Sequence, residues 1–374
     1  MISYIYLKNF KAFQEAEIAP THLNIFAGLN GMGKSTFLQA LLLLRQSYLQ
    51  NTLLDNGLLL NGNYLELGKG KDVFSQASTD DDLIVFEVEW DDEMKLVSEF
   101  QRQDEVDLLP TNRPLTLSDS QKIFQQALFT NQYQYLNAER ISPRDFFSVS
   151  AYHIEQLRSL GNHGQFTVHF IAENQRQEIP IKELSHPKAD SFVLLDQLDA
   201  WMNEITPKIK LASVLYYEFE IARLSYKFEV GKNYVTEGMR PTNVGFGLTY
   251  VLPIITAVIS ARPGDLLIIE NPESHLHPQG QALLGKLFAL AAEHGVQLFI
   301  ETHSDHVLNG VRVAVKHRDI SPDKVGIFFF ERNLEAEEHV TEIIQPYLDE
   351  NGRLDKKPKG FFDEWGKQLD ELLK

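Results

Sequence analysis

The sequence predicts an α/β protein with a mostly parallel sheet core, an antiparallel β subdomain and a helical insertion. First, helix-forming and strand-forming segments alternate from residue 245 to residue 330, which is typical of a parallel sheet covered on both faces. Second, an apolar strand at 23–28 leads through a glycine-rich loop into a helix. Third, residues 81–90 alternate apolar and polar side chains, as a half-buried antiparallel strand does.

Composition limits the function classes. A chain of 374 residues suits about two domains, or one composite domain with an insertion. Its formal charge is 35 − 52 = −17, so nucleic-acid binding would require a local basic patch or a basic partner. No apolar run is long enough to cross a bilayer and the first residues lack a signal-peptide pattern, so we expect a cytoplasmic protein without membrane contact. Because the chain has no cysteine, disulfides and thiolate metal sites are excluded.

The first half of the chain opens with strands and a helix. Short runs rich in β-branched and aromatic residues predict strands at 2–10 and 23–28, and the helix is expected at 33–49. Beyond the strand at 81–90, residues 101–120 are expected to form an exposed loop. A short helix is expected at 121–129 and a strand at 133–140.

The second half is expected to hold the insertion and the parallel core. An amphipathic helix is predicted at 191–205 and a strand pair at 213–230. After these, helices are expected at 247–259, 280–294 and 306–316, and strands at 265–270, 297–301 and 325–330. A terminal helix is expected at 360–374. The sequence shows no internal repeat and no sustained heptad pattern.

The segment Gly28–Ser35, "GLNGMGKS", fits the phosphate-loop pattern G-x-x-x-x-G-K-[ST] between a predicted strand and a predicted helix. Glycines in such a loop let backbone N–H groups face a β-phosphate, and Lys34 can reach the β- and γ-phosphate oxygens. The Ser35 hydroxyl is a ligand suited to Mg²⁺, and the helix N-terminus adds its dipole. The pattern therefore predicts a nucleotide site with Mg²⁺.

Three further features are expected to serve this nucleotide. Glu270 ends an apolar strand, where open α/β sheets place ligand groups, and can hold the water shell of Mg²⁺. His303 follows another strand and can contact a γ-phosphate. Gly245 and Gly247 open an apolar helix whose N-terminus can bind an anion. Because the chain already has a phosphate loop, this second anion site suggests contact with a nucleotide held by another copy.

A metal site is the alternative chemistry. His275, His277, His303 and His306 lie near one another in sequence, with Glu273 as a carboxylate, and such residues bind metal in hydrolases. This hypothesis leaves the phosphate loop unexplained.

The segments with these motifs, together with the first strand, resemble the ATPase heads of the ABC/SMC class in their order along the chain. They resemble more closely the bacterial ATPases related to the overcoming-lysogenization-defect (OLD) family, and the ending "LDENGRLDKKPKGFFDEW" is similar to a bacterial ATPase family found beside defence genes. The resemblance spans nearly the whole chain and is best at 1–48 and 240–374.

The resemblance implies a P-loop NTPase fold of the ABC-ATPase head type, built as one composite head. A lobe with Walker A and antiparallel strands is expected at 1–140, followed by an insertion at 141–240. A lobe with the signature, Walker B and switch histidine is expected at 241–345, and a C-terminal segment at 346–374.

Residue roles follow from the same resemblance. The Walker A residues would be Gly28, Asn30, Gly31, Gly33, Lys34, Ser35 and Thr36. Glu270 would be the Walker B acid and His303 the switch histidine. The signature motif would be Asn243, Gly245 and Gly247, a loose match to the usual Ser-Gly-Gly core. Arg140 is expected to line the nucleotide site, and no Q-loop glutamine is identified.

Two departures from the family pattern bear on function. Asn271 stands where the catalytic Glu is expected, and a neutral amide cannot take a proton from water. Glu273 is the nearest spare carboxylate, so either it acts as the base or turnover is slow. OLD-type nucleases continue into a Toprim domain, whereas no nuclease motif follows here, so the head is expected to act on a separate protein.

The predicted function is therefore an ATP-binding and slowly hydrolysing molecular switch. It would dimerise, or form a higher oligomer, around ATP and Mg²⁺ and control a separately encoded effector such as a nuclease or toxin, in bacterial anti-phage defence. The alternatives are an ATP-binding scaffold without significant turnover and a metal-dependent nuclease or hydrolase that uses the histidines.

Overall fold

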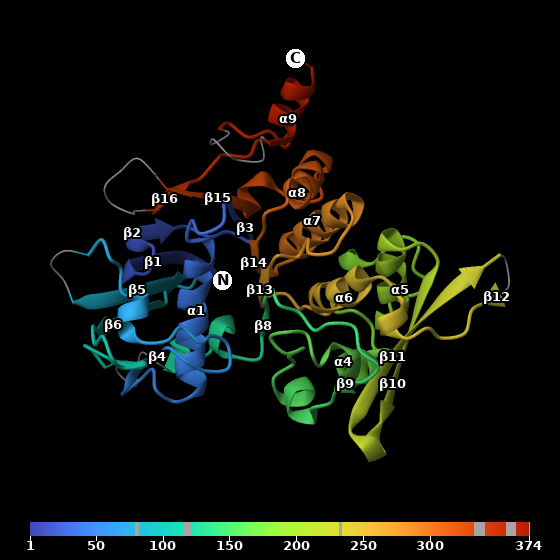
Figure 1. Cartoon of the computed structure of the whole chain (residues 1–374), viewed down its shortest axis with the longest axis horizontal. Helices are drawn as coiled ribbons and strands as arrows, with labels where there is room; N and C mark the ends of the chain where they lie inside the picture. Colours follow the sequence, from blue (N-terminus) through green and yellow to red (C-terminus); the bar gives the residue numbers. More distant parts are fainter. Residues whose placement is uncertain (79–81, 115–120, 232–233, 333–340, 357–363, 374) are drawn as a thin grey trace. The chain divides into compact units, whose positions relative to one another are not determined.

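A computed structural model describes residues 1–78, 82–114, 121–231, 234–332, 341–356 and 364–373. The chain forms two compact units, and Figure 1 labels the helices and strands of both. Unit 1 comprises Met1–Thr130, Val325–Asp349 and Leu354–Lys374, and unit 2 comprises Asn131–Lys324 and Glu350–Arg353. The expected single composite head, with its lobes, stays a prediction.

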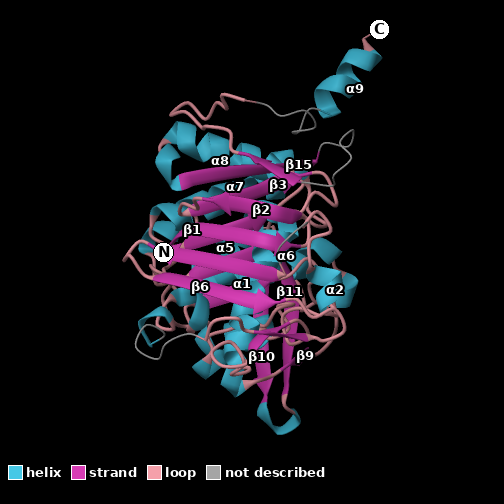
Figure 2. Ribbon diagram, turned by 90° about the vertical axis from the view of Figure 1, so that its left-hand side faces the viewer, coloured by secondary structure: helices cyan, strands magenta, loops and turns pink. Residues whose placement is uncertain are grey.

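Unit 1 contains a four-stranded antiparallel sheet (Figure 2). Its strand order is β2 (Phe13–Ile18), β1 (Ile2–Phe10), β5 (Leu83–Trp90) and β6 (Lys95–Gln101). Every second residue of β5 is buried, as the alternation in its sequence predicts for a strand with one face on the core. The expected antiparallel strand is therefore confirmed.

The second part of unit 1 holds the phosphate-loop segment. Strand β3 (Leu23–Gly28) runs parallel to β15 (Val325–Arg332), which pairs in antiparallel fashion with β16 (Thr341–Ile344). Helix α1 (Lys34–Leu49) follows β3 directly after the loop. The Phe37 ring of α1 packs 6.3 Å from Phe26 of β3 and 6.0 Å from Phe330 of β15, measured between ring centroids. These buried rings hold the helix against both strands.

Smaller elements complete unit 1. These are the paired strands β4 (Gly57–Leu59) and β7 (Leu108–Pro110), helix α2 (Gly70–Val73), the 3-10 turn η1 (Ala127–Phe129) and helix α9 (Glu364–Leu372). The predicted exposed loop at 101–120 was therefore wrong in part, because Leu109 is fully buried where β7 pairs with β4. Residues 115–120 lie outside the described residues, as do 357–363 of the expected terminal segment.

Unit 2 is built on three parallel strands in the order β14 (Gln297–Glu301), β13 (Leu266–Glu270) and β8 (Tyr133–Leu136). The strands are buried almost throughout, as expected for a sheet covered on both faces. The helices of this unit are α4 (Thr167–Asn174), α5 (Leu194–Ile205), α6 (Phe246–Ile259), α7 (Pro278–Glu293) and α8 (Asp305–His317).

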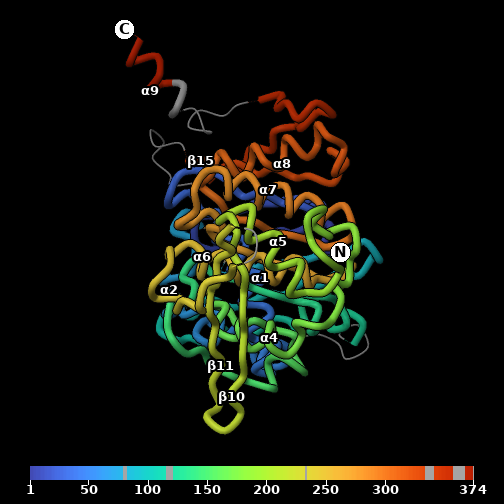
Figure 3. The backbone as a smooth tube through the Cα atoms, turned by 90° about the vertical axis from the view of Figure 1, so that its right-hand side faces the viewer, coloured from blue at the N-terminus to red at the C-terminus, as the bar shows by residue number. Residues whose placement is uncertain are grey.

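The insertion also contains a long hairpin of β10 (Ile209–Tyr216) and β11 (Ile221–Val230), which extends from the helices of unit 2 (Figure 3). This confirms the predicted strand pair. Short elements of the insertion are β9 (Phe147–Ser148), β12 (Tyr234–Val235), the π-helical turn η2 (Tyr152–Gln156) and the 3-10 turns η3 (Lys182–Leu184) and η4 (Tyr217–Phe219). The 3-10 turns η5 (Pro241–Asn243) and η6 (Pro322–Lys324) lie outside the insertion. Among the helices that the structure describes, none has the length and apolar character to cross a bilayer.

Candidate nucleotide-binding site

The phosphate loop of unit 1 has a backbone shape that requires glycine. Gly28, Gly31 and Gly33 have φ values of 141°, 77° and 88°, which side chains of L-residues rarely tolerate. At Gly28 there is also no room, since a Cβ atom would lie 2.4 Å from the carbonyl oxygen of Phe330 on β15. The sequence therefore folds this segment into a tight loop at the end of β3.

Lys34 is drawn into this loop. Its Nζ donates hydrogen bonds to the carbonyl oxygens of Gly28 at 3.0 Å and Leu29 at 2.8 Å, and only 3% of the residue is exposed. Helix α1 begins at Lys34 with no side-chain cap and no acidic residue in its first turn. A buried ammonium at an uncapped helix N-terminus fits a phosphate group, and Ser35 on the same turn offers a hydroxyl to Mg²⁺.

Arg332 is a cation beside this loop that the sequence did not single out. Its guanidinium Nη2 lies 3.5 Å from the carbonyl oxygen of Gly31, at the end of β15. The contact joins residues 301 positions apart, so no local pattern indicates it.

In unit 2, the carboxylate of Glu270 is held at the end of β13. Its Oε1 accepts a hydrogen bond from the Tyr135 hydroxyl of β8 at 2.9 Å, and the Ala138 backbone N–H lies 3.4 Å from Oε2. Burial raises the pKa of Glu270 above its ordinary value, while these hydrogen bonds and the nearby Arg140 act in the opposite direction. A Mg²⁺ ion would favour the charged form, so the position fits the expected Walker B acid.

Arg140 is buried beside Glu270, with 2% of its surface exposed. Its guanidinium donates to the backbone carbonyl oxygens of Asn271 at 2.6 Å, Glu270 at 2.7 Å, Asn137 at 3.0 Å and Tyr250 at 3.1 Å. Burial lowers its pKa to about 10, so it remains charged at neutral pH. Arg140 therefore supports the end of β13 through these carbonyls, and its expected role of lining the nucleotide site stays a prediction.

Asn271 has a conformational reason to be asparagine. Its φ is 44°, in the left-handed region that asparagine tolerates better than most residues with a side chain. Its backbone N–H donates to the Glu301 carbonyl at 2.8 Å and its carbonyl accepts from Arg140. The turn after β13 is thus fixed by backbone contacts, which the amide side chain does not provide.

Glu273 uses both carboxylate oxygens within unit 2. Oε2 accepts a hydrogen bond from the Thr302 hydroxyl at 2.7 Å, and Oε1 accepts from the His303 backbone N–H at 2.8 Å. The side chain therefore ties the turn after β13 to the end of β14. This arrangement favours a positioning role over that of a general base, because both carboxylate oxygens already accept hydrogen bonds within unit 2.

The predicted signature residues lie at the start of α6. Asn243 closes the 3-10 turn η5, and Gly245 is the N-cap without a side-chain hydrogen bond. No atom lies within 4 Å of a Cβ placed on Gly245, whereas a Cβ on Gly247 would lie 2.4 Å from the carbonyl oxygen of His275. Gly247 thus permits close packing of α6, and Gly245 is the glycine left open to a ligand.

The four histidines have separate surroundings. The His275 ring packs 4.8 Å from two aromatic rings of α6, His277 caps the start of α7, and His306 pairs with Asp305 at 3.6 Å. His303 is exposed after β14. Across the part of the chain that the structure describes, no three His, Cys, Asp or Glu side chains are grouped to hold a metal ion. The metal-dependent alternative therefore has no support from these residues.

The structure places the predicted residues in two groups. The predicted Walker A residues Gly28 to Thr36 belong to unit 1, and the predicted residues Asn243, Gly245, Gly247, Glu270, Glu273 and His303 belong to unit 2. Within unit 2, the contacts of Glu273 join the ends of β13 and β14, which carry Glu270 and His303. Tyr135 and Thr302, which hold the two acids, were not identified from the sequence because their partners are distant along the chain.

Solved structures similar to this chain are SMC heads. The SMC head bound to the C-winged helix domain of ScpA has a TM-score of 0.51 and 12% identity, covering 93% of this chain and 98% of that chain. The SMC head with an extended coiled coil bound to the C-terminal domain of ScpA, from Pyrococcus furiosus, has a TM-score of 0.51 and 11% identity over 100% and 99% of the two chains. The head from Thermotoga maritima has a TM-score of 0.46 and 12% identity over 92% and 98%. The first two likenesses confirm the predicted ABC-ATPase-like α/β fold.

Family models give the assignment. No curated protein matches the chain. Residues 320–372 match a family described as a protein of unknown function (DUF3696). Residues 23–309, well over half of the chain, match a model described as "AAA domain, putative AbiEii toxin, Type IV TA system". The protein therefore belongs to this AAA-domain family of ATPases, with the head fold of the ABC/SMC class.

Proposed function

We propose that the protein is an ATP-dependent molecular switch that binds ATP with Mg²⁺, hydrolyses it slowly and passes its state to a partner protein. Membership of an AAA ATPase family supports ATP binding. The observation that carries the proposal is the glycine loop of unit 1, in which buried Lys34 lies at the uncapped start of α1.

The proposal gives roles to the main predicted residues. Lys34 would bind the β- and γ-phosphates, and the Ser35 hydroxyl would be a ligand for Mg²⁺, which neutralises phosphate charge when bound. Glu270 keeps the role of Walker B acid and His303 that of switch histidine, as the resemblance implies. Glu273 keeps the turn after β13 in place through its two hydrogen bonds.

Slow turnover follows from the residues after Glu270. Asn271 cannot accept a proton from water, and both oxygens of Glu273 are engaged. The same observation favours a second candidate function, an ATP-binding scaffold without significant turnover. Single-turnover measurement of ATP hydrolysis separates the two, since a scaffold would release no phosphate within the lifetime of its complex.

We propose a homodimer or higher oligomer in which the start of α6 closes over a nucleotide held by another copy. Gly245 supports this role because its N-cap position is open and the following Phe246 is 43% exposed. The partner would be a separately encoded effector, such as a nuclease or toxin, in bacterial anti-phage defence. The resemblance to OLD-related ATPases and the toxin–antitoxin description of the matched family support this context.

Calorimetric titration with MgATP tests the proposal. Lys34→Ala should weaken binding by about 10- to 100-fold, as expected for loss of a charge-assisted hydrogen bond to phosphate. The matched control is Lys71→Ala. Lys71 is an exposed lysine of unit 1, and Glu105 keeps its ion pair with Lys69 when the Lys71 side chain is removed. Equal affinity of wild type and Lys34→Ala would remove the basis of the proposed function.

A further inference from the structure

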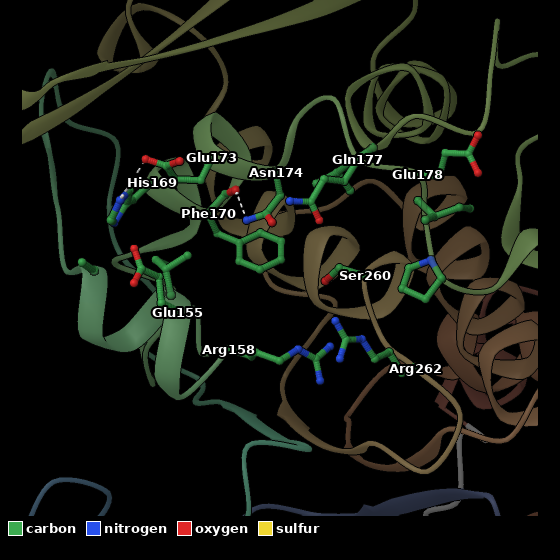
Figure 4. A pocket seen from close by; sticks show the side chains of 15 residues that line it. Glu155, Arg158, His169, Phe170, Glu173, Asn174, Gln177, Glu178, Ser260 and Arg262 are labelled. Atoms are coloured by element: carbon green, nitrogen blue, oxygen red, sulfur yellow. Dashed lines mark hydrogen bonds and ion pairs between the residues drawn. The ribbon is translucent and has the colours of Figure 1, made fainter.

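Unit 2 contains a pocket of about 490 Å³ that none of the residues discussed so far lines (Figure 4). Turn η2, helix α4, the segment after α4, the start of α5 and the segment after α6 form its walls. This volume falls within the range of sites for small organic ligands.

Two arginines lie together on one side of the pocket. Arg158 follows η2 and Arg262 follows α6, both line the pocket, and their guanidinium groups point toward one another (Figure 4). Asp265, which is 5% exposed, joins them: its Oδ2 accepts from the Arg262 backbone N–H at 2.9 Å and lies 3.4 Å from Nη2 of Arg158. A buried carboxylate thus positions both residues.

The Arg262 guanidinium has donors to offer a ligand. Among the described residues this guanidinium makes no hydrogen bond or ion pair, because Arg262 contacts Asp265 through its backbone N–H and its backbone carbonyl oxygen. Two adjacent guanidinium groups match a phosphate, because their planar N–H donors fit its oxygens. These arginines are the cationic part of a lining that also contains Glu155, Glu173 and Glu178, of which Glu178 pairs with Lys182.

The other side of the pocket carries an aromatic ring and two amides, together with the carboxylates of Glu173 and Glu178. The Phe170 ring faces the pocket between the arginines and the amides of Asn174 and Gln177 (Figure 4). Asn174 donates one hydrogen bond from Nδ2 to the Phe170 carbonyl at 2.9 Å, and its carbonyl oxygen can accept from a ligand. A half-buried phenyl ring flanked by amides suits a flat ring that carries nitrogen donors and acceptors.

We propose that this pocket binds a small molecule with the size and polarity of a nucleoside monophosphate. Its phosphate contacts Arg158 and Arg262, its ring packs on Phe170, and the amides of Asn174 and Gln177 bond the polar edge of that ring. Because Arg262 follows the C-terminal end of α6, the ligand contacts the end of that helix opposite Gly245. This is a second ligand site, separate from the phosphate loop.

The probe for this site is adenosine monophosphate, titrated into the full chain that carries Lys34→Ala. This background weakens the phosphate loop, so the result does not depend on whether that loop binds ATP. We expect Arg262→Gln to weaken binding about tenfold or more through loss of charge-assisted hydrogen bonds. Arg176→Gln is the matched control, since Arg176 is an exposed arginine close in sequence that does not line the pocket.

Two further measurements complete the test. Phe170→Leu should weaken the binding of adenosine monophosphate but leave the binding of inorganic phosphate unchanged, because only the nucleoside contacts the ring. Arg158 is left in place, since its removal would leave the Asp265 carboxylate without its guanidinium partner. The proposal is overturned if adenosine monophosphate does not bind at millimolar concentration, if it binds no more tightly than inorganic phosphate, or if Arg262→Gln binds it as well as the control.

Discussion

The guanidinium of Arg140 holds the backbone carbonyl oxygen of Asn271 at a distance of 2.6 Å, across 131 positions of sequence. The same side chain bonds the carbonyls of Glu270 on β13 and Tyr250 on α6. One buried cation therefore joins the strand end that carries the proposed Mg²⁺ ligand to the helix whose start carries Gly245. Their positions within unit 2 depend on this contact.

Arg140→Met should lower the free energy of unfolding by about 2–4 kcal/mol, because buried carbonyls lose a charged donor. The free energy of unfolding of Arg140→Lys should lie between those of wild type and Arg140→Met, since an ammonium can reach fewer of the carbonyls. Urea unfolding measures both. The control is Arg144→Met, because Arg144 is exposed and its guanidinium contacts the Ser142 carbonyl only at 3.4 Å. A loss below about 0.5 kcal/mol in Arg140→Met would contradict the supporting role.

Glu273→Gln tests whether this acid positions the turn or activates water. We expect ATP binding to persist and the single-turnover rate to fall less than about tenfold, because the amide oxygen can still accept one of the two hydrogen bonds. Removal of a general base would instead slow hydrolysis by about 10²–10⁴-fold. A loss in that larger range would restore the sequence-based prediction of Glu273 as the base.

Asn271→Glu should speed hydrolysis by placing a carboxylate where the family pattern has one. It should also lower stability by about 1–2 kcal/mol, since glutamate is disfavoured at a φ of 44°. Asn271→Asp is the matched variant, because it adds the charge on a side chain that tolerates this conformation better. Rapid-quench rates and thermal unfolding report the two effects, and a slower Asn271→Glu would show that the turn cannot present a base.

Gly245 and Gly247 should respond differently to substitution. Gly247→Ala should destabilise the protein by about 1–3 kcal/mol, because its Cβ would overlap the His275 carbonyl oxygen. Gly245→Asp should fold normally but weaken ATP-dependent dimerisation, since it brings a carboxylate towards the phosphates of the other copy. Thermal unfolding and sedimentation with ATP measure these outcomes. If Gly245→Asp dimerises with ATP like wild type, the contact in trans is wrong.

Asp199 on α5 gives the protein a predictable pH response. Burial raises its pKa from 3.8 to about 6, although its Oδ1 accepts from the Leu211 N–H at 2.7 Å. The folded state therefore binds more protons than the unfolded state between these values, and the resulting stability is lost as pH rises through about 6. At about pH 8 the ionised group lowers stability by on the order of 3 kcal/mol.

Asp199→Asn should remove this dependence. The variant should gain stability relative to wild type as pH rises from about 5 to about 8, because the amide oxygen keeps the Leu211 hydrogen bond without a charge. Urea unfolding at both pH values measures the change, with Asp196→Asn on the same helix as control. A constant difference between variant and wild type would show that Asp199 does not titrate in this range.

The core elements could be predicted because their signals are local. Strands β13 and β14 are continuous apolar runs, and β5 alternates over eight residues, so periodicity alone assigns them. Strand β7 was missed because three residues carry too little pattern, and its burial comes from pairing with β4 about 50 positions earlier. Helix α4 was missed for a similar reason, as its eight residues lie between irregular segments.

By itself the sequence determined the phosphate loop, since Gly28, Gly33 and Lys34 act within one turn of chain. It also determined the order of strands and helices, which depends on neighbouring side chains. The roles of Arg140, Glu273 and Gly247 emerge from the folded chain, because the contacts with Asn271, His303 and His275 that define them span 131, 30 and 28 positions. The physical reason is that a hydrogen bond or a close backbone approach needs two groups at one place, and sequence spacing specifies that place only within a single element.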